Sequence, residues 1–469
     1  MNKQYSKQIT AKTGWLIPAL LLVASAAQAD VFHVTSNADF GAGTLRNAID
    51  QANANPGPDE ITFADGLGTI TVTGQMEVSD TLTITGPAGG QVVSGDGQTR
   101  ILAVITEDTP LSLENLVLTD GLTSATSQSP FCTESDGNGG ALCSRSAVHL
   151  SRVTIQDSRT VGNGADGGGA QLFAGGTITD SIIRNNRVGG LTSSGGGLRA
   201  GGELIVHNTL IEDNQALGGG AAWGGGLVMR SGTTFIMTDS AVVNNSSSGG
   251  SGGLRVSRTL MENSIVSGNS APVSGGMTID LTVSLGGDPG APVIRNSTIS
   301  DNHDLQLDVP FGGGLRAIFY QVDYVLRLES VILAGNTGPA GNFNMAGSTQ
   351  NPDLDTGEVT VDVVHSLFGD DAAEINGQNL NNIFSDNPRL KPLADLGCAV
   401  PAGAPGTEQC VPVHVFMAGS PAVNAGSNPE GLEFDQRGPG FPRVNDGQAD
   451  IGSYESNDGL FADRFEMQP

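Results

Sequence analysis

The sequence predicts an all-β fold, a single-stranded parallel β-helix in which the chain winds into stacked coils. A short block that begins with Ser or Thr, continues with apolar residues and closes on Asn recurs at intervals of 24 to 34 residues. Such a period is typical of a solenoid, whose repeats bury their apolar side against their neighbours. Runs of two or three glycines recur at a similar interval, and no long helical pattern interrupts them. Glycine-rich, weakly charged chains can also be disordered, but the ordered period favours a fold.

Residues 1–29 have the form of a secretory signal peptide. Three lysines precede an apolar stretch from Trp15 to Ala24, and Ala27-Gln28-Ala29 offers a small-residue cleavage site. The stretch is short for a membrane anchor and is interrupted by Pro18. We therefore expect cleavage after Ala29, secretion to the outside or the outer cell surface, and no transmembrane segment in the mature chain.

The chain is strongly acidic, with a formal net charge of −27. Without the signal peptide, 19 basic side chains face 49 acidic ones. Nucleic acid is an unfavourable partner for such a field. The carboxylates could bind Ca²⁺, or they could serve solubility alone.

Residues 30–110 are predicted to form an N-terminal cap and the first coils. Leu45, Ala48, Ile49 and Ala52 have the spacing of a short amphipathic helix, and Thr44 is a suitable N-cap. A helix at this position would cover the open edge of the first coil.

Residues 111–386 are predicted to be the β-helix repeats. The residue three places before each closing position is always apolar, and alternation with a period of two places it inside the coil. These inward residues are Leu118, Ile155, Ile183, Ile211, Val242, Val266, Ile299 and Leu333. An Asn or Asp also recurs six places before the closing residue, as at Asp180, Asn208, Asp239 and Asn263, and predicts a stacked side-chain ladder.

A second strand follows each glycine run. The first residue after the run and the residue two places later are predicted to point inward, including Ala141 and Cys143 in the first of these coils. The residue between them should point outward. The outward residues of successive coils are Gln171, Arg199, Val228, Arg255, Thr278 and Arg316.

Residues 387–456 lose the repeat and are predicted to form an irregular C-terminal cap, followed by a tail over residues 457–469. The four cysteines form two close pairs, Cys132 with Cys143 and Cys398 with Cys410. In an oxidising compartment, two local disulfides are the simplest of the three possible pairings.

Several motifs at the two ends of the chain resemble one family. Gly43-Thr44-Leu45-Arg46-Asn47-Ala48-Ile49 near the start, and Gly419-Ser420-Pro421-Ala422, Asp435-Gln436-Arg437-Gly438 and Asp450-Ile451-Gly452 near the end, resemble bacterial secreted β-helix proteins of the choice-of-anchor Q type. The repeats also resemble those of polymorphic outer-membrane proteins. The resemblance implies export and, together with the crossover rule, a right-handed helix. It implies no particular reaction, and Asp435, Arg437, Arg443 and Asp450 are expected to form a structural salt-bridge cluster.

Two classes of function remain open, because fold alone does not choose between them. The preferred one is a non-catalytic surface or secreted protein that adheres to glycan, matrix or a host surface. The alternative is a polysaccharide lyase, or another enzyme acting on acidic glycans, since lyases of this kind resemble the fold. A lyase needs a cation to neutralise the uronate and a base to abstract its α-proton.

The candidate site is the outward row that follows the glycine runs. Arg199, Arg255 and Arg316 belong to this row, and Arg230 lies two places after Val228. Trp223 and Tyr320 are the candidate aromatic platforms, and Asp280, Asp304 and Asp308 the nearby carboxylates. Arginine forks in register could bind the repeated carboxylates of an acidic polysaccharide. They could equally be structural, if the coil carboxylates already occupy them.

Overall fold

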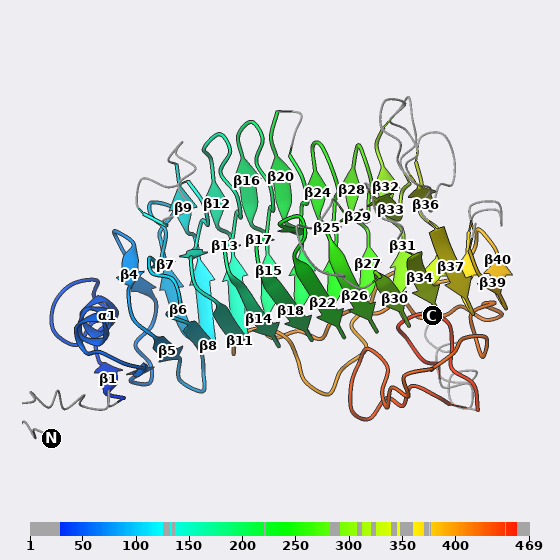
Figure 1. Cartoon of the computed structure of the whole chain (residues 1–469). Helices are drawn as coiled ribbons and strands as arrows, with labels where there is room; N and C mark the ends of the chain where they lie inside the picture. The colour runs from blue at the N-terminus through cyan, green and yellow to red at the C-terminus, as the bar shows by residue number, and fades with distance from the viewer. Residues whose placement is uncertain are drawn as a thin grey trace, which may run out of the picture.

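In the computed structural model, the described part of the chain winds into a parallel β-helix (Figure 1). The described residues are 29–124, 132–133, 137–219, 222–281, 291–306, 312–319, 325–338, 345–347, 360–369, 375, 377–445 and 447–456. The expected signal peptide, apart from its last residue, and the C-terminal tail lie outside these ranges, as do Asp308 and Tyr320. The paired strands of the three stacked sheets are all parallel, as the solenoid prediction requires.

A complete coil carries four strands, which belong to three sheets. The first and largest sheet contains β1 (Val31–Val34), β2 (Asp59–Phe63), β3 (Ile70–Thr71), β5 (Leu82–Thr85), β6 (Gln91–Ser94), β8 (Leu111–Thr119), β11 (Val148–Gln156), β14 (Gly175–Thr179), β15 (Ile182–Arg184), β18 (Glu203–His207), β19 (Leu210–Glu212), β22 (Thr234–Thr238), β23 (Ala241–Val243), β26 (Arg258–Glu262), β27 (Ile265–Ser267), β30 (Val293–Arg295), β31 (Thr298–Ser300), β34 (Val325–Glu329), β35 (Ile332–Leu333), β37 (Thr360–Val364), β38 (Leu367–Phe368), β39 (Asn379–Leu380) and β40 (Ile383–Phe384).

The second sheet is formed by the strands that follow the glycine runs. It contains β4 (Met76–Val78), β7 (Leu102–Val104), β10 (Leu142–Ser144), β13 (Ala170–Leu172), β17 (Leu198–Ala200), β21 (Leu227–Met229), β25 (Leu254–Val256), β29 (Met277–Leu281), β33 (Leu315–Phe319) and β36 (Met345–Gly347). The third sheet contains β9 (Leu122–Thr123), β12 (Arg159–Thr160), β16 (Arg187–Gly189), β20 (Gln215–Leu217), β24 (Ser246–Ser247), β28 (Ser270–Ala271) and β32 (His303–Asp304).

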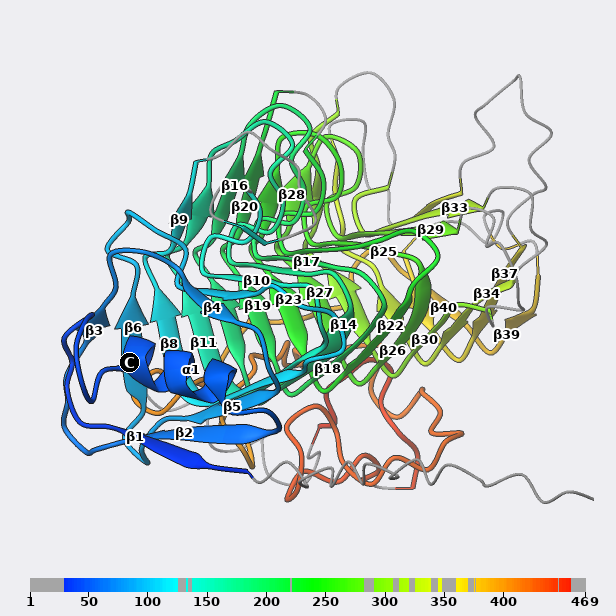
Figure 2. The same ribbon diagram turned by 60° about the vertical axis from the view of Figure 1, so that its left-hand side comes forward.

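The helix is right-handed. Viewed from the N-terminal end, the chain passes clockwise from β14 through the row of β19 and β23 to β16 and then β17, while advancing away from the viewer (Figure 2). This is the hand that connections between parallel strands nearly always take.

The N-terminal end carries the predicted helix, α1 (Leu45–Ala54). The Thr44 hydroxyl accepts a hydrogen bond from the Asn47 N–H and caps the helix, while Leu45, Ala48, Ile49 and Ala52 are buried. The helix contacts β1, β2 and β4, so its apolar side covers the first coils as expected (Figure 1).

The predicted inward residues form one continuous core. Ile183, Ile211, Val242, Val266 and Ile299 lie in this core, each no more than 1% exposed. Since each of these side chains lies in register with its counterpart in the next coil, the coils bury their apolar side mainly against one another.

The continuous side-chain ladder is formed by the closing asparagines. Those of successive coils are fully buried, and the Nδ2 of each donates to the Oδ1 of the next, as from Asn186 to Asn214 at 3.1 Å and from Asn214 to Asn245 at 3.0 Å. The ladder continues through Asn269, Asn302 and Asn336. The position six places earlier, where we predicted the ladder, has isolated rungs such as Asn208 to Asp180 and Asn263 to Asp239. There, aspartates alternate with asparagines, and the side chain of an aspartate has no N–H to donate to the next residue of the ladder.

The segment after Asn387, predicted as a cap, lies along the flank of the helix (Figures 1 and 2). We call residues 387–456 the strap. It has isolated bridges but no strands among its described residues. Its apolar side chains, including Val413 and Tyr454, cover outward-facing Ile182, Leu210 and Ile265, and further along Ala422 and Ile451 cover Ile332 and Leu367.

Turn residues of the coils fasten the strap. Asn208 donates to the Val400 carbonyl at 2.9 Å, Asn263 to the Phe434 carbonyl at 3.0 Å and Asn296 to the Ser427 carbonyl at 2.8 Å. The residues of the predicted turn ladder therefore also bind the strap. Their repetition did not reveal this second role, because the strap itself has no period.

Candidate anion-binding groove

The predicted outward row is in register on the second sheet. Gln171 pairs with Arg199, Arg199 with Val228, and Val228 with Arg255. The row continues through Thr278 to Arg316. Arg199 and Arg255 therefore lie two coils apart on one face, about 10 Å from backbone to backbone at the usual strand spacing.

Cys143 is a correction to the predicted register. It pairs with Gln171 and so belongs to the outward row, whereas Leu142 occupies the inward position beside Ala170. The shift arises because Ala141 takes the place of the third glycine of the run, as shown by its N–H donating to the Gly169 carbonyl at 2.9 Å. Cys143 bonds to Cys132 and Cys398 to Cys410, so both predicted disulfides are present.

The residues that precede the glycine runs form a wall beside this row. Asp166, Ser194 and Trp223 bridge one another in parallel from coil to coil. The glycines that follow allow this wall to approach the next strand closely. A Cβ on Gly196, for example, would lie 2.3 Å from the Gly225 carbonyl oxygen.

Two adjoining cavities open between the wall and the row. The first has a volume of about 280 Å³ and is lined by Asn138, Asp166, Gln171, Phe173, Arg199, Ala200, Gly201 and Arg230. The second, of about 290 Å³, is lined by Ser194, Arg199, Val228, Met229, Arg230, Ser231, Arg255, Val256, Ser257 and Asp280. Arg199 and Arg230 belong to both. We call the combined depression the arginine groove.

Two of the three groove arginines have carboxylate partners. Arg199 forms an ion pair with Asp166, and Arg255 donates to Asp280 at 2.5 Å. The Arg255 guanidinium also lies over the ring of Trp223, 4.1 Å from its centroid, a favourable cation–π geometry. Burial, followed by the positive charges of Arg230 and Arg255, lowers the pKa of Arg199. The groove is therefore crowded with positive charge despite its carboxylates.

Arg230 is the open cation of the groove. Its side chain is exposed, and no hydrogen bond or carboxylate partner for its guanidinium occurs among the described residues. The backbone explains its position: the Arg230 N–H donates to the Ala200 carbonyl at 2.7 Å, which holds the residue just beyond β21.

Among the described residues, two further predicted site residues, Arg316 and Asp304, are not part of this groove. Arg316 is half-buried on the same row but lines neither cavity. Asp304 is buried on β32 in the third sheet. Tyr320 lies outside the described residues.

Asp166 and Asn138 were missed by the sequence analysis, although a signal existed. Each occupies the position directly before a glycine run, as do Ser194 and Trp223. The glycine runs served only to place the strand that follows each of them, so the wall that precedes them was not predicted.

The strap contains a second polar cluster, made of the residues that were expected to form salt bridges. Arg437 pairs with buried Asp435 as expected, whereas Arg443 donates to the backbone carbonyls of Asp450 and Gly452 at 2.7 and 2.8 Å and forms no ion pair among the described residues. These contacts hold the strap together. Within the described ranges, no group of three or more His, Cys, Asp or Glu side chains is arranged to hold a metal ion. In the same part of the chain, no helix is long and apolar enough to cross a bilayer.

Comparison with known proteins gives distant structural likenesses. No family model matches the sequence, and no curated protein matches it. The solved structures similar to it include the pectate lyase Pel9A, at 12% identity over 91% of this chain and 96% of that one, with a TM-score of 0.48. The cedar pollen allergen jun a 1 matches at 15% identity over 69% and 82%, with a TM-score of 0.34. A mannuronic acid-specific family 6 lyase from human gut microbiota matches at 16% over 76% and 83%, with a TM-score of 0.31. Similarity this low does not bear on the activity of the chain.

Proposed function

We propose that this protein is an exported, non-catalytic β-helix that binds acidic polysaccharide in the arginine groove. The observation that carries the proposal is the convergence of Arg199, Arg230 and Arg255 on two joined cavities, with Arg230 exposed and unpartnered among the described residues. Export and membership of the bacterial choice-of-anchor Q type belong to the same proposal, and the end motifs support them.

The geometry suits a polymer with regularly spaced carboxylates. Guanidinium groups bind carboxylates through paired hydrogen bonds, and the row places arginines along the helix axis. The half-buried Trp223 ring, already covered by Arg255, supplies one wall. Because the chain as a whole is acidic, the long-range field repels such a ligand, and binding should be weak and sensitive to salt. Adhesion through many weak contacts fits this regime.

Binding of tetragalacturonate to the mature protein at low salt tests the proposal. Replacing Arg230 by Gln removes the exposed charge-assisted contact and should weaken binding about tenfold. The triple variant Arg199→Gln, Arg230→Gln, Arg255→Gln should abolish it. Arg187→Gln is the matched control, because Arg187 is also an exposed arginine, on β16, and lines neither cavity. Undetectable wild-type binding, or binding that survives the triple change, would refute the proposal.

A polysaccharide lyase is the second candidate, and one observation favours it. The groove holds three arginines that could neutralise a uronate carboxylate, which is one requirement of a lyase, and the ion pair with Asp166 favours the charged form of Arg199. A lyase leaves unsaturated sugar ends that absorb in the ultraviolet. Steady growth of this absorbance, lost in Arg199→Gln, would replace the non-catalytic proposal.

A further inference from the structure

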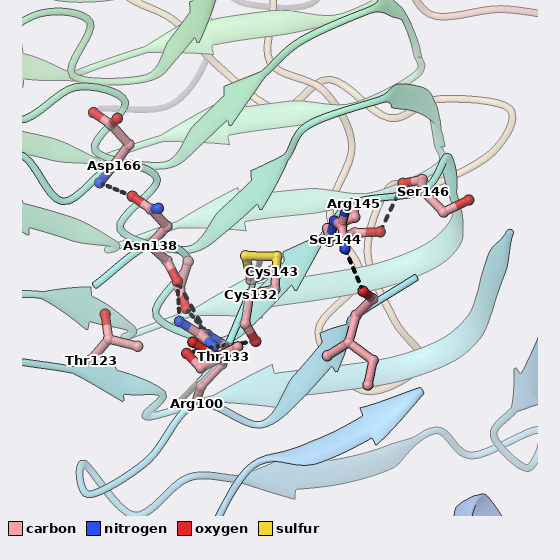
Figure 3. The surroundings of a disulfide bond; sticks show 12 residues. Arg100, Thr123, Cys132, Thr133, Asn138, Cys143, Ser144, Arg145, Ser146 and Asp166 are labelled. Carbon is pink, nitrogen blue, oxygen red and sulfur yellow. Dashed lines mark hydrogen bonds between the residues drawn. A yellow bond between two sulfur atoms is a disulfide. The ribbon is translucent and has the colours of Figure 1, made fainter. Parts of the chain in front are cut away.

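Asn138 lines one cavity of the arginine groove, and a disulfide lies nearby (Figure 3). Cys132 is bonded to Cys143, which precedes Gln171 on the outward row, and both are fully buried. Arg100, only 2% exposed, donates to the carbonyls of Cys132 and Thr133 at 3.1 Å, and to that of Asn138 at 2.6 Å (Figure 3). The disulfide and this arginine together hold the backbone at Cys132, Thr133 and Asn138.

Asn138 connects this anchored backbone to Asp166. Its side chain is 4% exposed, and its Oδ1 accepts the Asp166 N–H at 3.0 Å (Figure 3). Asp166 Oδ1 in turn accepts the Ser194 N–H at 2.9 Å. The backbone and one carboxylate oxygen of Asp166 are thus held by the wall, and the other oxygen, Oδ2, is the one that meets Arg199.

We infer that Asp166 is an internal counter-ion that competes with the ligand for Arg199, and that Asn138 and the Cys132–Cys143 disulfide position it there. The inference rests on the proposed function. Asp166 presents to Arg199 the same chemical group that a uronate would present. A ligand carboxylate can reach Arg199 only by sharing or displacing it.

The charges around the groove support this competition. Asp166 occupies Arg199 from the wall and Asp280 occupies Arg255 from β29, while Arg230 between them is open. The free groove is therefore neutralised at both ends and attractive only in the middle. Removing the charge of Asp166 leaves two arginines without counter-ions and strengthens the local field for an anion.

The first test is Asp166→Asn, which keeps an oxygen for the Ser194 N–H and removes only the charge. Tetragalacturonate should bind this variant about fivefold more tightly at low salt, an effect typical of one partly exposed ion pair. Asp395→Asn is the control, because Asp395 is exposed on the strap and likewise accepts a backbone N–H, from Gly397. This control makes the same change in net charge away from the groove and should leave binding unchanged.

A double-mutant cycle separates competition from a merely structural role. In the Arg199→Gln background, Asp166→Asn should no longer tighten binding, because the arginine for which it competes is absent. An equal gain in both backgrounds would overturn the inference, as would unchanged or weaker binding by Asp166→Asn alone.

The positioning role has its own variants. Asn138→Ala, and the pair Cys132→Ser with Cys143→Ser, should also tighten binding, by less than Asp166→Asn, and should add nothing once Asp166 is Asn. Gains in affinity that persist in the Asp166→Asn background would show that Asn138 and the disulfide affect binding by a route other than Asp166. If the double cysteine variant does not fold, Asn138→Ala decides. If the wild-type protein binds no tetragalacturonate, the proposed function itself is refuted.

Discussion

Glu455 is a buried carboxylic acid of the strap, and its surroundings shift its pKa. Its side chain is 1% exposed and accepts the N–H groups of Asn445 and Asp450, both at 2.9 Å. Those hydrogen bonds favour the charged carboxylate, but burial outweighs them and raises the pKa of Glu455 to about 7. This residue is therefore close to half-protonated near neutral pH.

A pH dependence of stability follows from this raised pKa. The folded state holds the proton more tightly than the unfolded state, so the contribution of Glu455 is fully present below about pH 4.5 and is lost as the pH rises through about 7. The difference in unfolding free energy between wild type and Glu455→Gln should thus fall, by up to about 3 kcal/mol, between about pH 4 and about pH 8. Denaturant titrations at both pH values measure it. A constant difference would mean that folding leaves the pKa of Glu455 unchanged.

The glycine runs are the elements whose backbone most constrains substitution. A Cβ on Gly196 would approach the Gly225 oxygen to 2.3 Å and the Gln215 carbonyl carbon to 2.5 Å, both backbone atoms. Neither atom can move without shifting a whole coil, because each is fixed by the stacked strands.

Gly196→Ala should therefore destabilise the protein by on the order of 3 kcal/mol. Gly89→Ala is the matched control, since a Cβ there meets nothing within 4 Å and the backbone is not left-handed, and its effect should stay within about 0.5 kcal/mol. Chemical denaturation of the two variants gives the comparison. Equal stabilities would indicate that the glycine bend relaxes more easily than its geometry suggests.

The sequence predicted those elements whose residues repeat. Ile183 and Ile211 were placed inside the coil because one inward position per strand recurs in every repeat, and α1 was found because its apolar spacing and Thr44 cap are local. Cys143 was misplaced because one alanine replaced a glycine and hid the register. Ile182 and Leu210 are apolar residues at outward positions, which indicates that this outer face is also buried. Nothing in the repeat pattern specified what covers them.

Contacts between distant segments were not predictable in this way. Asp166 meets Arg199 because the turn before one glycine run approaches strand β17 of the next coil, and that approach depends on glycine geometry as well as on residue type. The strap contacts coils more than 200 residues earlier, as in the hydrogen bond between Thr154 and Thr407 at 2.7 Å. It has neither a period nor strands to reveal where it lies.

At the scale of the whole molecule, the strap joins coils that otherwise touch only their neighbours. Its polar and apolar contacts extend along the flank from Thr154 to Leu367. In a simple solenoid, stability is a sum of repeat and nearest-neighbour terms. The strap adds contacts shared by many repeats, and so it should make their unfolding more cooperative.

A chain that ends at Asp386 tests this role. It exposes the apolar flank, and because each fully buried Leu or Ile is worth about 2 kcal/mol, it should unfold at least about tenfold faster than the full chain. It should also bind a hydrophobic dye. Val413→Asp, at a strap position only 1% exposed, should reproduce part of both effects in the full-length protein. Unchanged unfolding rates and no dye binding would mean that the strap is only an attachment.

The place of the strap in the chain has a consequence for biosynthesis. The coils are made first and can stack in the order in which they are synthesised, since each needs only its predecessor. The strap residues are made after the coils, more than 250 positions beyond the first coil residue that they contact, and contacts between such distant residues form slowly. Until the strap is made, the nascent molecule exposes an apolar strip along the flank from Ile182 to Leu367. Prematurely terminated chains keep that strip, which marks them for chaperones and proteases.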